Sequence, residues 1–363
     1  MISQLLIPTS TLQQAVQKMA LASSAASDSL RWVRVEGTGN ALRFFTNTKQ
    51  LDTEIYVELE TPHNPFTFEV SGPLLKSIGG LLPEENTEIR VGEGEVTIHS
   101  GRSQFHLACN ADDASHVRKA DLSSVQLMDT NFPALFESFA KVGYASEASC
   151  GHRPYAECVA VRGPRLFATD GFRASSYPNM EINFRDPVFL NTVQLAILAK
   201  IYKGVGTIGG LAISRERLIL SCQGVTTTLR ASNIKDDGPD YNSAIPCGPC
   251  SSVRVNKAHL KDAVARSLAV ASAKAPRTVI YFSAGELRFK TEGDGIVTTD
   301  LLECDYSGPD VELIINPNFF LQAVRSVEDS SGEVILEIRG GKNPLVVADS
   351  QREHINVICL VRI

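Results

Sequence analysis

Residues 12–20 have the sequence LQQAVQKMA, in which Leu12, Ala15, Val16, Met19 and Ala20 are the apolar members. This spacing places all five side chains on one face of an α-helix. The same spacing recurs in residues 132–140 (FPALFESFA) and, with a serine at one position, in residues 260–268 (LKDAVARSL). Amphipathic helices that recur roughly every 120 to 130 residues predict a threefold internal repeat.

Each third of the sequence also contains a second predicted helix. Its entries are residues 70–75 (VSGPLL), 190–195 (LNTVQL) and 315–320 (INPNFF). In each entry an apolar strand-like run leads to a polar residue and then to an apolar helix. Alternating runs such as residues 278–282 and 334–338 predict strands around these helices. We therefore expect an α+β fold of three tandem units, each with two helices backed by sheet.

Polar residues mark where the first helix of each unit is expected to begin. The candidates for the capping position are Asn131, Asn256 and either Thr9 or Ser10. Proline and glycine in residues 245–250 (IPCGPC) suit a linker between the second and third units. The predicted domains are residues 1–119, 120–246 and 247–363.

The composition is that of a globular protein with a net acidic charge. The 363 residues include 35 Lys and Arg and 41 Asp and Glu, for a formal net charge of -6. Tight binding of nucleic acid needs clustered cations, so the acidic balance argues against a protein that grips nucleic acid but does not exclude one that surrounds DNA loosely. No apolar run approaches the roughly 20 residues that span a bilayer, and the first residues lack a signal-peptide pattern. We expect a cytoplasmic protein whose eight cysteines are reduced.

Six short motifs, distributed along the whole chain, resemble those of the bacterial replicative sliding clamp, the beta subunit of DNA polymerase III. They are residues 69–76 (EVSGPLLK), 100–105 (SGRSQF), 168–173 (ATDGFR), 238–241 (GPDY), 316–319 (NPNF) and 361–363 (VRI). Any one of these motifs is a weak signal. Their order and spacing within a threefold repeat make the resemblance specific.

The resemblance implies a fold and a function. Two chains would associate head to tail into a six-domain ring, with helices lining the hole and sheets outside. The ring would encircle double-stranded DNA without sequence preference and tether its partners. These would be the catalytic subunit of DNA polymerase III, the clamp loader and other proteins that carry a clamp-binding peptide. Such a processivity factor is not an enzyme and needs no cofactor.

Helices that line a DNA-containing hole should carry cations on their non-apolar faces. Lys and Arg do occur at these positions, and acids on the same helices are few, although any solvated helix face can carry such residues. The predicted DNA-facing residues are Lys18, Lys76, Lys141, Lys200, Lys203, Lys261, Arg266 and Arg325.

The resemblance also implies a pocket that binds a short peptide with an apolar Leu/Phe pair. The matching positions are Tyr155, Thr169, Gly171, Phe172, Arg173, Pro239, Asn316, Phe319, Val357, Cys359, Val361 and Arg362. Without the resemblance, Thr169 to Gly171 would be interpreted as a turn and Val357 as a core residue. The sequence departs from the family at Phe172 (usually His), Ala174 (commonly Leu), Ser243 (Arg) and residues 359–361 (Met-Pro-Met).

The implied seam between two chains involves Phe105 and Leu107 on the first domain. Their expected partners on the third domain, Ala269 and Val270, are smaller than is usual in the family. The seam is therefore expected to be weaker or differently packed.

Three alternatives remain open from the sequence. One is a divergent accessory clamp, and another is a protein-binding scaffold of the same fold that does not encircle DNA. The third, remote, alternative is a thiol-disulfide oxidoreductase, because Cys247 and Cys250 have the spacing of a thioredoxin-type site. That chemistry needs a helix after the motif, and residues 251–255 predict a strand. Metal binding by the pair would need two further ligands, so no metal site is predicted.

Overall fold

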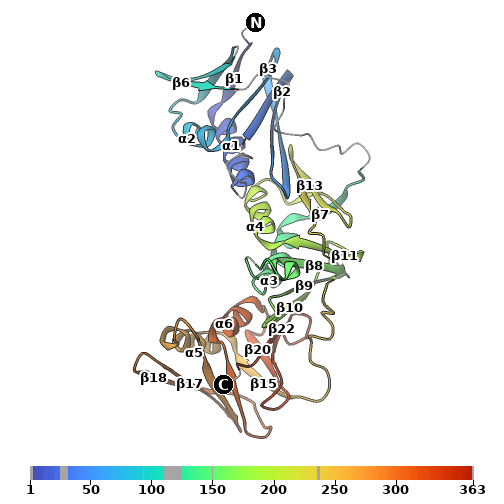
Figure 1. The fold of residues 1–363 in the computed structure, drawn as a ribbon, viewed down its shortest axis with the longest axis vertical. Coiled ribbons are helices and arrows are strands. Elements are labelled where there is room, and N and C mark those ends of the chain that lie inside the picture. The colour runs from blue at the N-terminus through green and yellow to red at the C-terminus, as the bar shows by residue number, and fades with distance from the viewer. Residues whose placement is uncertain are drawn as a thin grey trace. The chain divides into compact units, whose positions relative to one another are not determined.

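The computed structural model describes residues 3–24, 32–92, 94–109, 125–148, 150–234 and 238–361. The chain divides into two compact units, whose helices and strands are labelled in Figure 1. The first unit comprises Met1–Phe136 and Val193–Ala231, and the second comprises Glu137–Thr192 and Ser232–Ile363. The predicted domain boundary at 119/120 lies outside the described residues, and the three-domain division stays a prediction.

The first unit contains two antiparallel sheets. The four-stranded sheet has the order β1 (Ser3–Pro8), β4 (Asn86–Val91), β5 (Glu95–Ser100) and β6 (Ser103–Ala108). The six-stranded sheet has the order β2 (Trp32–Asn47), β3 (Leu51–Ser71), β14 (Val225–Arg230), β13 (Arg217–Cys222), β12 (Ile208–Ile213) and β7 (Met128–Asn131).

Strand β2 doubles back on itself. The Thr46 hydroxyl donates a hydrogen bond to the carbonyl oxygen of Trp32 over 2.9 Å, although 14 residues separate them. A straight strand of that length would hold the two residues more than about 40 Å apart. Gly39, with φ of 62°, lies between the two legs and supplies the left-handed conformation that a tight turn needs. The first leg pairs with residues 66–71 and the second with residues 52–58, both in β3.

Helices α1 (Thr9–Ser23) and α2 (Gly72–Gly79) pack against each other in the first unit. The predicted apolar face of α1 is confirmed, since Leu12, Ala15, Val16 and Met19 are buried. The prediction that Thr9 or Ser10 caps α1 is wrong. The helix begins at Thr9 after Pro8 without a side-chain cap, and the Thr9 hydroxyl instead lies 2.8 Å from the Thr87 hydroxyl.

The division between the units falls within α3 (Phe132–Gly143) and at the start of α4 (Thr192–Ile201). The Asn131 side chain accepts a hydrogen bond from the Ala134 amide over 3.0 Å, as the capping prediction requires. Phe132, Leu135 and Phe139 are buried as predicted, whereas Ala140 at the end of the predicted face is exposed.

The second unit also contains two antiparallel sheets. The eight-stranded sheet has the order β11 (Phe184–Asn191), β8 (Cys158–Gly163), β9 (Arg165–Thr169), β10 (Arg173–Pro178), β22 (Ile355–Ile358), β21 (Leu345–Ala348), β20 (Glu333–Ile338) and β15 (Ser251–Asn256). The four-stranded sheet has the order β18 (Ile296–Glu303), β17 (Glu286–Gly293), β16 (Thr278–Ser283) and β19 (Val311–Ile315). A short 3-10 helix, η2 (Pro154–Glu157), precedes β8.

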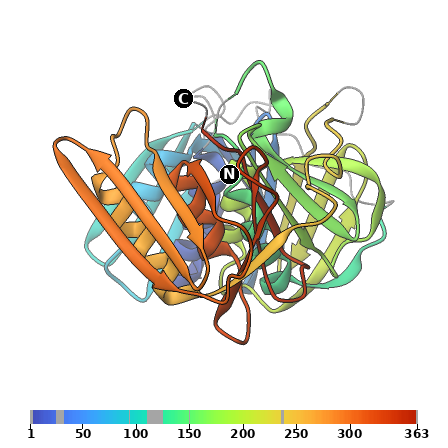
Figure 2. The ribbon, with the colours of Figure 1, turned by 90° about the horizontal axis from the view of Figure 1, so that it is seen from below.

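Helices α5 (Lys257–Val270) and α6 (Pro317–Ser326) lie side by side in the second unit, next to the long strands β17 and β18 (Figure 2). The Asn256 side chain accepts from the His259 amide over 3.1 Å and so caps α5, as predicted. Leu260, Ala263 and Val264 of α5 are buried in a core that includes Phe289 and Phe320, whose rings stack at 6.4 Å.

One strand order recurs through both units. In the second unit, four strands follow α3 and four follow α5. Each group lies in its sheet in the order fourth, first, second, third strand, as β11-β8-β9-β10 and β19-β16-β17-β18. In the first unit the legs of β2 and β3 take the same order. The third strand of a group pairs with the last strand of the repeat that follows it, as β10 does with β22 and β3 with β14. The predicted α+β fold of repeated, sheet-backed helix pairs is confirmed.

No helix in the described part of the chain is long and apolar enough to cross a membrane.

Candidate functional site

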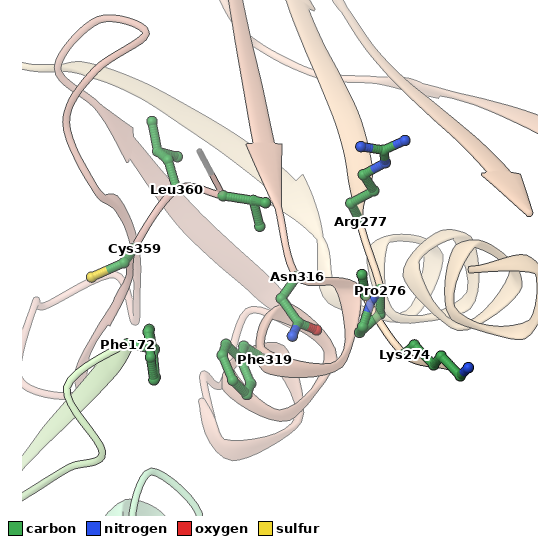
Figure 3. A pocket seen from close by; sticks show the side chains of 10 residues that line it. Phe172, Lys274, Pro276, Arg277, Asn316, Phe319, Cys359 and Leu360 are labelled. Atoms are coloured by element: carbon green, nitrogen blue, oxygen red, sulfur yellow. The ribbon is translucent and has the colours of Figure 1, made fainter. Parts of the chain in front are cut away.

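A cleft of about 710 Å³ opens on the second unit (Figure 3). Phe172 and Cys359 lie on one side, Lys274, Pro276 and Arg277 on the other, and Phe319 between them. Its lining residues are Phe172, Lys274, Ala275, Pro276, Arg277, Asn316, Phe319, Cys359, Leu360 and Val361.

The turn between β9 and β10 places Phe172 at the cleft. Asp170 Oδ1 accepts hydrogen bonds from the amides of Phe172 and Arg173 over 2.9 and 3.0 Å. The Thr169 hydroxyl accepts from the Gly171 amide over 3.1 Å and donates to the Arg173 carbonyl over 2.6 Å. Gly171 has φ of 89°, a conformation that other residues adopt at a cost. The closed turn leaves the Phe172 ring 58% exposed.

Arg173 packs against Phe319, the residue between the two sides of the cleft. Its Nε donates to Asp170 Oδ2 over 2.9 Å, and its guanidinium lies 4.4 Å from the centre of the Phe319 ring. It also contacts the ring of Tyr144 and the side-chain oxygen of Gln322. Because its donors and its flat face are engaged within the protein, Arg173 positions Phe319 rather than lining the cleft.

Residues 359–361 form a wall that is fixed on two sides. The Cys359 amide donates to the Phe172 carbonyl over 2.9 Å, and the Val361 amide donates to the Ile314 carbonyl over 2.8 Å. The same segment borders a second cavity of about 620 Å³, which Glu312, Lys342 and Pro344 help to line. Asn316 caps α6 through the Asn318 amide at 2.9 Å, which sets Phe319 in the first turn of the helix.

The structure brings five of the predicted pocket residues together in the lining: Phe172, Asn316, Phe319, Cys359 and Val361. Thr169, Gly171 and Arg173 build the turn behind it. Arg362 lies outside the described residues.

Three other predicted pocket residues lie elsewhere. Val357 is buried in an apolar cluster with Val346 and Ile355. Tyr155 packs against a separate cluster around Phe167. Pro239 is partly buried and does not line the cleft.

The motif comparison missed one side of the cleft. Lys274, Ala275, Pro276 and Arg277 follow α5 and form this side, and Leu360 adds to the opposite wall. A proline between two cations just before a predicted strand was visible in the sequence. Nothing in the sequence placed that segment opposite Phe172, because the juxtaposition depends on how the two sheets of the unit pack.

The predicted DNA-facing cations differ in their surroundings. Lys76, Lys200, Lys203 and Arg325 are exposed near the ends of α2, α4 and α6. Lys261 is half-exposed, with its Nζ 3.7 Å from Asp262. Lys18 is partly buried in α1, and desolvation lowers its pKa.

Two of these predicted cations are engaged inside the second unit. Lys141 is 7% exposed, and its Nζ lies 2.5 Å from Glu328 and 3.6 Å from Glu137. This geometry does not fit a DNA-facing role, because phosphate contact would require breaking a partly buried ion pair. Arg266 is more exposed, but its Nη2 forms an ion pair with Asp300 Oδ1 of β18 at 2.6 Å.

The predicted seam residues lie on β6 and at the end of α5. Phe105 is partly buried on β6, which is an edge strand, whereas Leu107 is buried in the core of the first unit. Ala269 is exposed and Val270 partly buried at the end of α5. Among the described residues, no group of His, Cys, Asp and Glu is arranged to hold a metal ion.

The fold described above is similar to that of solved bacterial sliding clamps. Residues 242–361 match the family described as DNA polymerase III beta subunit, C-terminal domain. The chain has the fold of the bacterial DNA polymerase III beta clamps, and residues 242–361 match that family's C-terminal domain, which confirms the resemblance drawn from the six motifs. A search of curated protein sequences found no match.

Solved structures with this fold match along essentially the whole chain. The DNA polymerase III beta subunit from Pseudomonas aeruginosa is 20% identical, with a TM-score of 0.88 over 99% of this chain and 100% of that one. The sliding clamp from Bacillus subtilis is 18% identical, with a TM-score of 0.88 over 100% and 99%. A P. aeruginosa clamp bound to griselimycin is 19% identical, with a TM-score of 0.88 over 99% and 100%.

Proposed function

We propose that this chain is a DNA sliding clamp, a processivity factor that encircles duplex DNA and performs no chemistry of its own. The observation that carries the proposal is the clamp fold along essentially the whole chain. The family match over residues 242–361 supports it independently. Its partners would be the DNA polymerase III catalytic subunit, the clamp loader and proteins with a clamp-binding peptide, all acting in the cytoplasm.

The strand order supports a head-to-tail ring of two copies. Wherever one strand set meets the next within a unit, a third strand pairs with a last strand, as in β10 with β22 and β3 with β14. Among the described strands, two that occupy these positions remain at sheet edges: β18, a third strand, and β6, a last strand. Pairing β18 of one copy with β6 of another would repeat the internal rule and satisfy both edges.

The test of encirclement is topological. The protein would be loaded onto nicked circular DNA by the clamp loader of the same cells with ATP, and then separated from free protein by gel filtration. A ring stays on the circle and is lost once a restriction enzyme linearises it. Equal retention before and after linearisation would refute encirclement, and so would failure to load in the presence of an active loader.

We further propose that the cleft binds an extended peptide through an apolar side chain. Phe172, Phe319 and Val361 offer apolar surface at a partly exposed cleft, which is the setting in which buried apolar anchors contribute most to binding. Asn316 adds a polar group that can fix the direction of the peptide. The Phe172 ring replaces the histidine usual in the family, so the contact on that side would be more apolar.

The two cations opposite Phe172 would select peptides with an acidic residue beside the apolar anchor. Lys274 and Arg277 are both exposed, and no acidic side chain from the described part of the chain lines this cleft. Exposed charges of one sign chiefly accelerate the encounter with an opposite charge and discriminate against like charge.

We predict that the double variant K274E/R277E binds an Asp-containing Leu/Phe peptide at least about tenfold more weakly than the native protein. A peptide with Asn in place of Asp should lose much less, and fluorescence anisotropy at low salt would measure both. Lys49→Glu, an exposed lysine of the first unit, is the control for net charge. Equal losses for the two peptides would contradict the charge selection while leaving the apolar site intact.

A further inference from the structure

Cys247 and Cys250 are both exposed and reduced in the segment CGPC that leads into β15. Gly248 has φ of 94°, so the chain bends between the two cysteines at a residue without a side chain. The next residue, Ser251, begins a strand, and the helix N-terminus that activates the thiol of a thioredoxin-type site does not follow. A different source of positive charge lies beside the pair.

Two arginines supply that charge. Ser251 pairs with Ile338 at the end of the β15–β20 ladder, so the next residues, Cys250 and Arg339, adjoin its last pair. Arg352 donates to Glu337, which pairs with Ser252, two residues after Cys250. The pKa of Arg352 is raised first by this hydrogen bond and also by Cys247 and Cys250.

The arginines are only partly neutralised. Glu337 accepts from Arg339 Nη2 over 2.8 Å and from Arg352 Nε over 2.7 Å, so one carboxylate serves two guanidinium groups. The Arg339 side chain is only 9% exposed, and its Nε and Nη1 have no hydrogen-bond partner among the described residues. Buried donors without an acceptor are costly, and an anion nearby would relieve that cost. A cysteine thiolate is such an anion.

The other cysteines have a different environment. Burial raises the pKa of Cys158 to about 11 and also raises that of Cys109 and Cys304. Cys150 and Cys222 are buried. Cys359 is exposed at the cleft, but no second cysteine stands within three residues of it. Cys359 is therefore a matched control for exposure without a neighbouring thiol.

We propose that Cys247 and Cys250 form a reversible thiol–disulfide couple, activated by Arg339 and Arg352, that reacts with low-molecular-weight disulfides such as glutathione disulfide. The Cys250 thiolate attacks one sulfur of the disulfide and releases the other half as a thiolate. The Cys247 thiolate then attacks Cys250 Sγ and releases the second half. Two cysteine thiols are oxidised by two electrons to one disulfide, and the small disulfide is reduced to two thiols, which take up the two protons.

The test uses the full-length protein in buffers with graded ratios of glutathione to glutathione disulfide. Reactions are quenched with acid, the remaining thiols are alkylated, and the peptides are mapped by mass spectrometry. We expect a disulfide between Cys247 and Cys250, and modification of Cys250 at least about tenfold faster than that of Cys359. Cys247→Ser should trap the glutathione mixed disulfide on Cys250.

Variants of Arg352 separate activation from mere exposure. Arg352→Gln should slow the reaction of Cys250 several-fold and leave the rate at Cys359 unchanged, whereas Arg352→Lys should keep most of the native rate. If the Gln variant fails to fold, the Lys variant and the native rates at the two sites still decide the matter. Equal rates at Cys250 and Cys359, or mixed disulfides alone in the native protein, would overturn the proposal.

Discussion

His354 shows how burial fixes the charge of a single residue in this protein. Its side chain is 1% exposed, its Nε2 lies 3.3 Å from the Ser175 hydroxyl, and its ring packs edge-on against Tyr177. Desolvation, and then the nearby charge of Lys141, lower its pKa from 6.5 to about 4. The ring is therefore neutral in the folded protein at neutral pH.

This residue should make the protein less stable in acid. Between pH 6.5 and 4 the unfolded chain binds a proton at His354 that the folded chain does not, so the free energy of unfolding falls as the pH falls through this window. The contribution of this site is up to roughly 1.4 kcal/mol per pH unit. Urea denaturation of the native protein and of His354→Gln would measure it. The variant should show a shallower loss between pH 6.5 and 4.5, and parallel curves would contradict this role.

At the scale of single elements, β18 exposes large apolar side chains at the edge of its sheet. Val297 and Leu301 are each 59% exposed on its outward face, while Leu302 on the other face packs into the core. The long antiparallel pairing with β17 protects one edge of the strand, and the other edge is open within its sheet. An open edge with apolar side chains favours association with another strand.

We predict that Val297→Lys combined with Leu301→Lys weakens self-association at least about tenfold, because the charges would have to be desolvated at the seam. Sedimentation velocity across a dilution series would measure the change. Leu6→Glu is the control, since Leu6 is 55% exposed on β1, at the edge of its sheet opposite β6. If the two variants dissociate alike, or if the native protein is monomeric at micromolar concentration, the proposed seam is wrong.

The elements were predictable where local pattern determines them. Helical periodicity located α1, α3 and α5, and the amide side chains of Asn131 and Asn256 cap two of them as expected. The sequence could not exclude Thr9 as a cap, because the Thr9 hydroxyl instead contacts the hydroxyl of Thr87, which is 78 residues away.

The site was predictable only in part, for the same physical reason. Phe172 and Phe319 were found through motifs, since each lies in a locally determined turn or helix start. Lys141 looked like any solvated helix cation, and only tertiary packing against Glu328 removes it from the surface. To predict that Lys274 and Arg277 lie opposite Phe172, one would have to know how distant segments of the chain pack together.

At the scale of the whole molecule, the proposed encirclement of DNA has to be reconciled with a net charge of -6. The exposed cations Lys76, Lys200 and Arg325 are the predicted residues best placed to contact phosphates, because no carboxylate holds them among the described residues. Such contacts are independent of sequence and weaken as salt rises.

Neutralising all three with glutamine should reduce the affinity for a short duplex several-fold at low salt. It should also flatten the salt dependence, by up to about 0.9 in the logarithmic slope for each contact removed. Anisotropy titrations at several salt concentrations would give both quantities, with Lys49→Gln as the control. An unchanged slope would remove these residues from the DNA-facing set.

The anchoring of residues 359–361 on both sides has a kinetic consequence. The wall of the cleft is tied to the Phe172 turn and to β19 by main-chain hydrogen bonds, so its ordering is completed when the protein folds. A preorganised receptor loses little conformational entropy on binding. A peptide should therefore associate in a single fast phase, with an observed rate that rises linearly with its concentration. Differences in affinity between partners would then appear as differences in how long each one stays bound.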